Sequence, residues 1–280
     1  ADIVIRLDNE KDVSCFGIAD GDISITVSGG TSPYTYSWTK DLRPYATSED
    51  ISNLSPGIYT VTVFDANGCG PKTASFTITE PLQLEANLLS KTDILCFGSR
   101  TGSINVDVVG GTSGYTFAWT GPNAFISSNQ NLTALLAGVY NLTVTDRMGC
   151  TTTLSVTLTQ PTELQISQVT QQISCFNANN GAISVSINGG VAPYNILWSN
   201  LSTNATIQNL APGTYRVTVT DANNCQKSLS VTIAQPPIFT VNPVLTHVSC
   251  NGGNNGSINL NFVGAVSPVN IVSEDRKTSK

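Results

Sequence analysis

Short runs in which apolar and polar residues alternate recur along the whole chain. Within residues 57–69, the side chains of Tyr59, Val61 and Val63 fall on one face of an extended segment, because successive side chains of a strand point to opposite faces. Nearly the same stretch returns at residues 138–150 and 213–225. No long window carries the apolar stripe of a helix. The pattern therefore predicts an all-β protein built of repeated units.

The repeat sets the predicted domain boundaries. Equivalent cysteines recur at positions 15, 96, 175 and 250, at a nearly constant interval. Each unit has a Cys-Phe-Gly-like turn, an alternating strand, a Gly-Gly pair, an aromatic strand and a Gly-Xaa-Tyr strand, and its last strand ends in proline. Proline cannot donate to a sheet ladder, so it marks a boundary. We predict three complete domains and one incomplete domain, at residues 1–81, 82–161, 162–237 and 238–280.

The fourth unit contains only the first half of the pattern. Cys250 and Gly264 match the opening of the other units, but Ser273 stands where a tryptophan is expected, and a polar run follows it to Lys280. Half a sandwich would expose unpaired strand edges. We expect a segment cut from a longer protein; the alternative is that a partner chain completes the fold.

Each unit also carries a corner that indicates the fold. An apolar-alternating strand turns through Pro-Gly into the Gly-Xaa-Tyr strand, as at the corner between strands E and F of an immunoglobulin-like sandwich, where a tyrosine hydroxyl bonds to nearby backbone. We predict tandem immunoglobulin-like β-sandwich domains in an end-to-end array, with short linkers that favour a stiff string. The predicted core residues are Trp38, Trp119, Trp198, Tyr59, Tyr140 and Tyr215.

Composition argues against nucleic acid and a membrane as binding partners. Charged residues make up 11% of the chain, and the net charge is −6, which argues against nucleic acid because that partner requires clustered Lys and Arg. No run of about 18 apolar residues occurs, so we expect no membrane insertion. The N-terminus lacks a basic and apolar leader. We therefore expect a mature or excised segment.

The seven cysteines predict disulfides in an oxidising, extracytoplasmic setting. None forms the Cys-Xaa-Xaa-Cys pair typical of a metal site. Cys250 is expected to remain unpaired in this segment. The predicted structural disulfide cysteines are Cys15, Cys69, Cys96, Cys150, Cys175 and Cys225.

Two pairings of these cysteines stay open. Pairing within each unit joins 15 to 69, 96 to 150 and 175 to 225. In an immunoglobulin-like sandwich, however, these two turns lie at opposite ends of a strand of ~7 residues, which spans more than ~20 Å, and bridged Cα atoms must come within ~7 Å. Pairing between units joins 15 to 150 and 96 to 225, and it is the working hypothesis. The within-unit pairing survives if only one strand separates the tryptophan strand from the tyrosine strand, because that would reverse the latter.

No residue set predicts catalysis. His247 is the only histidine, so no triad that uses histidine repeats with the units, and we expect neither an enzyme nor a cofactor. The tryptophans are interpreted as core rather than as sugar-stacking platforms. Aspartates near tight turns are interpreted as turn-capping residues rather than calcium ligands, because an oxygen cage needs about six ligands. These aspartates are Asp20, Asp22, Asp65, Asp146 and Asp221.

The combined motifs resemble one known repeat family. They are Cys-Phe-Gly, Gly-Ser-Ile-Xaa-Val, Gly-Gly-Thr-Xaa-Pro-Tyr-Xaa-Tyr-Xaa-Trp, Leu-Xaa-Pro-Gly-Xaa-Tyr-Xaa-Val-Xaa-Val-Xaa-Asp-Ala-Asn-Gly-Cys and a terminal Gln-Pro. Together they resemble the SprB repeat of large surface adhesins in gliding Bacteroidetes, over about the whole chain. Pro33 becomes Gly114 in the second unit, and Gly17 becomes Asn177 in the third. The resemblance implies a parent protein that is a long, type IX-secreted surface filament gripping a substratum.

We therefore expect a structural and adhesive segment of a bacterial cell-surface protein that acts as a stiff rod in attachment or gliding. Its expected partners are neighbouring repeats and a surface polysaccharide or substratum. Two alternatives remain. A carbohydrate-binding module array predicts an exposed aromatic ridge, and a self-assembling extracellular fibre subunit predicts that a neighbour completes the fourth domain.

Overall fold

The computed structural model describes residues 2–68, 71–264 and 269–272. These residues form antiparallel strands and one short 3-10 turn, and no α-helix occurs among them. The prediction of an all-β protein is confirmed. The chain separates into two compact units, one made of residues 1–94 and 98–160 and the other of residues 95–97 and 161–280. Each unit is described by itself below, and "repeat 1", "repeat 2" and "repeat 3" denote residues 1–81, 82–161 and 162–237.

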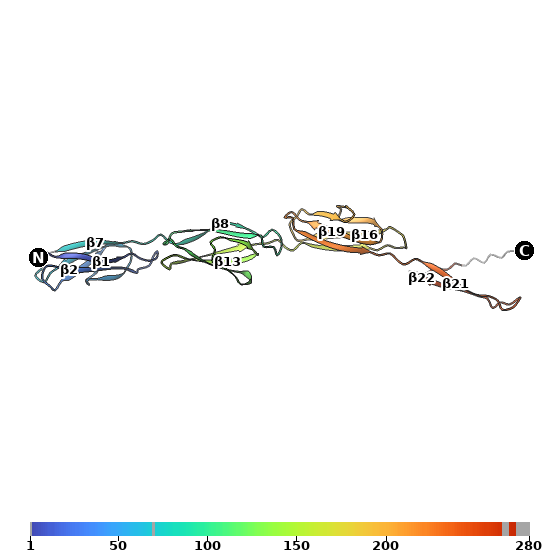
Figure 1. The fold of residues 1–280 in the computed structure, drawn as a ribbon, viewed down its shortest axis with the longest axis horizontal. Coiled ribbons are helices and arrows are strands. Elements are labelled where there is room, and N and C mark those ends of the chain that lie inside the picture. Colours follow the sequence, from blue (N-terminus) through green and yellow to red (C-terminus); the bar gives the residue numbers. More distant parts are fainter. Residues whose placement is uncertain (1, 69–70, 265–268, 273–280) are drawn as a thin grey trace. The chain divides into compact units, whose positions relative to one another are not determined.

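Repeat 1, in the first unit, is a sandwich of two antiparallel sheets (Figure 1). The order β1-β2-β5 defines the first sheet and β4-β3-β6-β7 the second. The first sheet contains β1 (Val4–Lys11), β2 (Gly21–Ser28) and β5 (Ile51–Leu54). The second contains β3 (Thr35–Lys40), β4 (Arg43–Ala46), β6 (Gly57–Phe64) and β7 (Lys72–Ile78).

Repeat 2 completes the first unit with the same two-sheet arrangement. Its sheets have the orders β12-β9-β8 and β11-β10-β13-β14. A single 3-10 turn, η1 (Pro122–Ala124), precedes its shortest strand. The first sheet contains β8 (Glu85–Thr92), β9 (Gly102–Val109) and β12 (Leu132–Leu135). The second contains β10 (Thr116–Gly121), β11 (Phe125–Ser127), β13 (Gly138–Thr145) and β14 (Thr151–Leu158).

Repeat 3, in the second unit, lacks one strand. Its second sheet is β17-β19-β20, without the outer strand that β4 and β11 supply in the other repeats. The first sheet contains β15 (Gln165–Gln171), β16 (Gly181–Asn188) and β18 (Thr206–Leu210). The second contains β17 (Asn195–Trp198), β19 (Gly213–Thr220) and β20 (Gln226–Ile233).

The last described element is a hairpin of β21 (Thr240–Thr246) and β22 (Ser257–Val263). It corresponds to the first two strands of the complete repeats, and no other strand of the described residues pairs with it. Phe262 of β22 stacks on Phe239, which precedes β21, with ring centroids 6.2 Å apart. The predicted polar run from Ser273 to Lys280 lies outside the described residues.

Three separate hydrophobic cores lie between the sheet pairs, one in each complete repeat. The alternation seen in the sequence explains them, because in β6 the buried residues Tyr59, Val61 and Val63 alternate with more exposed ones. Each core gathers residues from a single repeat, so each sandwich buries its own apolar face. This arrangement is that of immunoglobulin-like sandwiches in tandem, as predicted, while the residue at which one domain ends and the next begins stays a prediction.

Candidate functional site: the cysteine turns and the tyrosine corners

The loop between the first two strands of each repeat is bonded to the end of the last strand of the same repeat. In repeat 1 this loop carries Cys15. The backbone N–H of Val13 donates to the carbonyl of Thr79 over 3.1 Å, and that of Gly17 donates to the Glu80 carboxylate over 2.9 Å. The loop therefore lies at the exit of the sandwich, where the following repeat begins.

The same two bonds recur in the other complete repeats. Ile94 and Ile173 donate to the carbonyls of Thr159 and Ala234. Further along the loop, the backbone N–H of Gly98 donates to the Gln160 side-chain oxygen over 2.8 Å. The N–H of Asn177 likewise donates to the Gln235 side-chain oxygen over 3.1 Å. The Glu or Gln before each boundary proline thus holds the cysteine loop, a role that sequence reasoning missed.

A buried aspartate holds the second cysteine turn, between the last two strands of repeats 2 and 3. Asp146 is only 5% exposed. Its Oδ1 accepts from the backbone N–H groups of Met148 and Cys150, both over 2.9 Å, and its Oδ2 accepts from Thr112 over 2.8 Å. Asp221 makes the equivalent bonds to Asn223, Cys225 and Val191. The aspartate therefore fixes the cysteine turn to the Gly-Gly turn.

The Gly-Gly turn in turn contacts the segment by which the chain enters the repeat. Gly110 has φ +73°, and a Cβ on it would lie 1.8 Å from the carbonyl oxygen of Gln83. Gly29 and Gly189 have the same constraint at the entry segments of repeats 1 and 3, near Asp2 and Glu163. Only glycine fits a positive φ with a backbone this close. The second cysteine turn therefore lies at the entrance of repeats 2 and 3, whereas the first cysteine loop lies at the exit of each repeat.

The structure accordingly joins cysteines of successive repeats. Cys15 is bonded to Cys150 with Cα atoms 5.7 Å apart, inside the first unit. Cys96 is bonded to Cys225 with Cα atoms 5.6 Å apart, inside the second unit. The Asn223 amide also donates to the carbonyl of Leu95 over 2.9 Å beside the second bond. Of the two pairings that the sequence left open, these bonds follow the between-unit one.

The strand-reversal condition for within-unit pairing does not hold. Repeat 3 has only β18 between its tryptophan strand and its tyrosine strand, yet β17 still pairs antiparallel with β19, as β3 does with β6. The chain crosses from one sheet to the other without turning back, so the number of intervening strands leaves the direction of the tyrosine strand unchanged.

One cysteine differs from the predicted pattern, one agrees with it, and a third is not described. Cys175, expected in a disulfide, is free and exposed, because Cys225 is already bonded to Cys96. Cys250 is also free and exposed. Cys69 lies outside the described residues. Cys175 and Cys250 occupy the exit-loop position that Cys15 and Cys96 occupy in repeats 1 and 2.

A shallow groove flanks each disulfide. In the first unit it is lined by Phe16, Leu84 and Thr151 together with the cysteines. In the second unit it is lined by Phe97, Leu164 and Gln226, at equivalent positions. The two phenylalanines are 51% and 52% exposed. Each groove therefore combines one accessible aromatic ring with polar neighbours.

The three predicted core tryptophans are buried, each only 1% exposed. The indole N–H of each donates to a backbone carbonyl over 2.9 Å, in the connection that follows its strand; the acceptors are Ser48, Asn129 and Asn204. A buried ring with a satisfied N–H is unavailable for stacking on a sugar. The carbohydrate alternative therefore needs aromatic residues other than these three.

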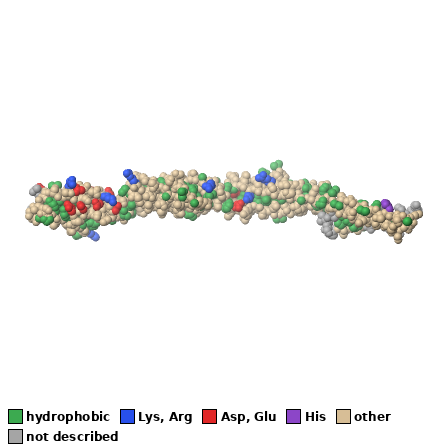
Figure 2. Space-filling model, turned by 60° about the horizontal axis from the view of Figure 1, so that its bottom comes forward, with side chains coloured by type: hydrophobic (Ala, Val, Ile, Leu, Met, Phe, Trp, Pro, Cys, Tyr) green, Lys and Arg blue, Asp and Glu red, His purple; other side chains and the backbone are tan. Residues whose placement is uncertain are grey.

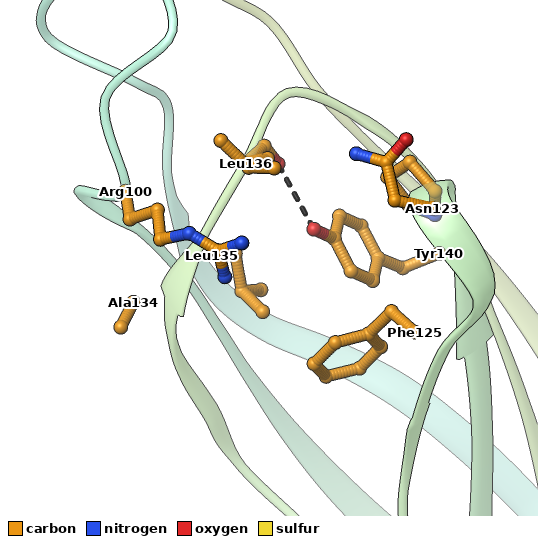
Figure 3. Close-up of a pocket in the computed structure, with 8 residues that line it drawn as sticks. Arg100, Asn123, Phe125, Ala134, Leu135, Leu136 and Tyr140 are labelled. Carbon is orange, nitrogen blue, oxygen red and sulfur yellow. Dashed lines mark hydrogen bonds between the residues drawn. The ribbon is translucent and has the colours of Figure 1, made fainter.

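The tyrosine corners have the hydroxyl bond typical of this fold. Tyr59, Tyr140 and Tyr215 donate to the carbonyls four residues earlier, over 2.8, 3.0 and 3.1 Å. In repeat 2 the ring of Phe125 covers Tyr140 edge-on, with centroids 5.4 Å apart. Figure 3 shows this corner, with the Tyr140 hydroxyl bonded to Leu136. Burial raises the pKa of the Tyr140 hydroxyl.

The corner of repeat 3 differs from the prediction. Tyr215 was expected in the core, but it is only half-buried. In repeat 1, Tyr45 of β4 packs edge-on against Tyr59 at 5.1 Å, and Phe125 of β11 does the same in repeat 2. Repeat 3 has no strand at this place, so the ring of Tyr215 lacks a cover.

Two further carboxylates hold backbone in the exit loops. Asp20 and Asp93 accept backbone N–H bonds from Ser14 and Thr159 over 2.8 and 2.7 Å, and these bonds hold the pKa of each carboxyl below its ordinary value. Among the described residues no group of three or more His, Cys, Asp or Glu side chains is placed to hold a metal ion. The described part of the chain also has no helix long and apolar enough to cross a membrane.

Charge is unevenly distributed along the surface. Eleven of the 19 acidic residues lie in residues 1–81, and Figure 2 shows acidic side chains gathered over that repeat on the face in view. Lys and Arg are scattered singly on this face. On the face in view, the Lys and Arg side chains form no continuous stripe of the kind that contacts a phosphate backbone.

The fold and the paired turns define a protein of tandem β-sandwich repeats linked by disulfides. The chain belongs to the SprB repeat family, whose model matches it four times, at residues 8–41, 88–124, 167–203 and 242–271. Each of the first three matches runs from the first strand of a repeat to just beyond its tryptophan. The recognition of this family from the sequence motifs is confirmed.

Other comparisons are more distant. A stretch of 64 residues is 34% identical to a decoration protein of Escherichia phage T5, covering 20% of this chain and 39% of that protein, so the chain spans about two fifths of that relative. Among solved structures, the three N-terminal domains of the bacteriophage RB49 highly immunogenic outer capsid protein (Hoc) match at 14% identity and a TM-score of 0.42, over 83% of this chain and 97% of that chain. Immunoglobulin domains 1–5 of Sidekick-1 match at 10% identity and a TM-score of 0.34, over 84% and 60%.

Proposed function

We propose that this chain is a structural and adhesive repeat segment of a long bacterial cell-surface protein, and that it acts as a stiff, force-bearing rod in surface attachment or gliding. The observation that carries the proposal is the pair of disulfides between successive repeats. A junction held by a peptide linker and a disulfide has fewer accessible orientations than one held by a linker alone. The repeats are therefore suited to transmitting force.

Three features support the extracellular and non-enzymatic parts of this proposal. Disulfides persist in oxidising compartments outside the cytoplasm. SprB repeats occur four times in the chain, and the resemblance to gliding adhesins implies a surface location. The polar side chains that recur in every repeat, such as Asp146 and Gln160, are engaged in holding turns. We infer that the shared design of the repeats serves mechanics rather than chemistry.

The proposal is tested in cells that display the parent protein. The paired substitutions C15S/C150S and C96S/C225S remove the two disulfides without leaving half of either pair as a lone thiol, and I126A, at a residue 80% exposed on β11, is the control. At equal surface display, we expect weaker attachment under shear flow for the paired variants and unchanged attachment for I126A. If all strains stay attached equally at every shear stress up to the one that detaches the wild type, a force-bearing role of the disulfides is contradicted.

The grooves beside the disulfides favour one further candidate, a carbohydrate-binding array. Sugars stack on accessible aromatic faces, and Phe16 and Phe97 present such faces next to polar side chains at equivalent positions. This function predicts that F16A/F97A loses binding to surface polysaccharide in a pull-down, whereas F64A, a partly exposed phenylalanine on β6, does not. Absence of polysaccharide binding by the wild type would remove this candidate and leave the mechanical one.

A further inference from the structure

The two disulfides overlap along the sequence. Cys15–Cys150 spans 135 residues and Cys96–Cys225 spans 129. Residues 96–150 belong to both closed loops. Each disulfide joins two successive repeats. Because the second loop begins before the first one ends, both disulfides enclose the same stretch of repeat 2.

Cysteine positions divide each repeat into two kinds of segment. From Cys96 to Cys150 the chain runs through β9–β13 and contains the core tryptophan Trp119. We refer to such a stretch, from exit-loop cysteine to entrance-turn cysteine, as a core segment. The stretch from Cys150 to Cys175 is less than half as long and contains only β14 and β15. We refer to this stretch, which joins two repeats, as a joining segment.

We propose that the two overlapping disulfides form a covalent bypass, which makes the path that carries the load between Cys15 and Cys225 much shorter than the chain between them. A pull that reaches Cys15 passes through the disulfide to Cys150 and along β14 and β15 to Cys175. The core segment of repeat 2 lies outside this route but joins the two disulfides directly, so it becomes the shortest path that carries the load once the repeats have unfolded. A second route arrives at Cys96, passes to Cys225 and then follows the next joining segment to Cys250. The core segments connect the two routes to each other.

The two free cysteines continue these routes. Cys175 and Cys250 hold the exit-loop position and are exposed. In repeat 3 the loop is bonded to Ala234 and Gln235, as its counterparts are bonded in repeats 1 and 2. The partner that fits Cys175 is thus the entrance-turn cysteine of another SprB repeat, held by a buried aspartate as Cys150 and Cys225 are.

The bypass limits how far the chain can lengthen. An extended chain spans at most ~3.5 Å per residue. Without disulfides, the chain from Cys15 to Cys225 therefore extends to about 740 Å. With both disulfides, the shortest covalent route between these cysteines runs from position 150 back to position 96, a stretch of about 190 Å. A repeat can therefore lose its fold under load while most of its length stays hidden.

Single-molecule pulling on the full chain, with handles at its two ends, tests this inference through the final contour length. Between positions 15 and 225 we expect a contour of about 190 Å in the oxidised wild type and about 740 Å after reduction. C15S/C150S leaves one disulfide and the route from 15 to 96, of about 280 Å. C96S/C225S leaves the route from 150 to 225, of about 260 Å. C250S should match the wild type.

The C15S/C150S variant distinguishes the bypass from pairing within repeats. Within-repeat bonds would leave about 180 Å of contour in the wild type, which is almost the same as the bypass value. In C15S/C150S, however, they would leave only the 175–225 loop closed and would expose about 560 Å. A contour of about 560 Å rather than about 280 Å in this variant overturns the inference.

Peptide mapping of the oxidised wild type provides a check that needs no variant. A peptide that joins positions 15 and 150 is expected, because the structure bonds these two cysteines. A peptide that joins positions 15 and 69 would overturn the inference.

This inference deepens the proposed function and rests on it only for the source of the load. The two fail separately. Contours that match the bypass in the wild type and both paired variants, together with unchanged attachment under shear, would keep the bypass and refute the adhesive role. Weaker attachment of the paired variants, together with the long within-repeat contour in C15S/C150S, would refute the bypass alone.

Discussion

The turns at the two ends of each repeat are alike in all three sandwiches, whereas the connection in the middle differs in each. At the ends, the exit loop is bonded to the residue before the boundary proline, and a buried aspartate holds the entrance turn. In the middle, repeat 1 has β4, repeat 2 has η1 and β11, and repeat 3 has neither. The structure of the two ends is therefore under a constraint that does not act on the middle connection.

That constraint is the neighbouring repeat. An exit-loop cysteine must meet an entrance-turn cysteine of the next repeat, with Cα atoms 5.7 Å and 5.6 Å apart in the two observed pairs. The middle connection accepts the tryptophan N–H in every repeat, but the strand that covers the corner tyrosine is absent at Tyr215. The difference shows that the turns that meet the neighbouring repeat vary less than the middle connection. The predictions below compare residues of these turns with residues of the middle connection.

The largest effect is expected for Gly110→Ala, in the Gly-Gly turn. The new Cβ would lie 1.8 Å from the Gln83 carbonyl oxygen at φ +73°, so the entry segment must move, at a cost of at least about 3 kcal/mol in the free energy of unfolding. Gly149→Ala is the control, because φ there is +89° but nothing lies within 4 Å; it should cost about 1–2 kcal/mol. Urea unfolding that gave equal costs would show that the close approach is unimportant.

Asp146→Ala is expected to follow, with a loss of about 2–3 kcal/mol in the free energy of unfolding, because unsatisfied buried donors are costly. The substitution removes the acceptor of three backbone N–H groups. Asp146→Asn keeps one oxygen that can accept these bonds, the amide carbonyl, and should lose less unfolding free energy. Asp107→Ala, at an exposed position of β9, is the control and should stay within about 0.5 kcal/mol. Equal melting temperatures for D146A and D107A would contradict the anchoring role.

Phe125→Ala tests the middle of repeat 2, with an expected cost of about 1–2 kcal/mol, below that of fully buried phenylalanines because its ring is only partly buried. The substitution uncovers Tyr140 and should make it resemble Tyr215, so quenching of tyrosine fluorescence by acrylamide should rise. Ile126→Ala, at a residue 80% exposed, serves as the control. Unchanged quenching would mean that Phe125 does not shield the corner.

The smallest effect concerns pH at the exit loop of repeat 2. The pKa of Asp93 is lowered in the folded state, mainly by the backbone bond from Thr159, so its contribution to stability is present above the unfolded pKa of ~3.9 and is lost as pH falls through the folded pKa. Between pH 5 and pH 2.5, the melting temperature of the wild type should therefore fall slightly more than that of D93N. Repeat 3 has neutral Gln172 in the equivalent bond to Ala234, so Q172A should not change this pH dependence.

Local patterns in the sequence predicted the strands, the repeat period and the tyrosine corner, because alternation and turn chemistry are encoded within a few residues. The pairing of Cys15 remained open because it depends on which end of the sandwich each turn occupies, and that follows from strand directions. The exposure of Tyr215 was mispredicted because a missing neighbour leaves no mark near the tyrosine itself. Gln160 went unnoticed because its partner, Gly98, lies 62 residues earlier.

The spacing of the bonded cysteines also constrains the order in which the molecule matures. Cys96 precedes Cys150 in the chain, so a thiol that belongs to the other disulfide lies nearer in sequence to Cys15 than its own partner does. Oxidation in order of synthesis would produce wrong bonds. In the folded chain the exit loop of repeat 1 is bonded to Thr79 and the entrance turn of repeat 2 is held by Asp146. We therefore expect folding to precede oxidation, because the folded turns place the two thiols of each native pair next to each other.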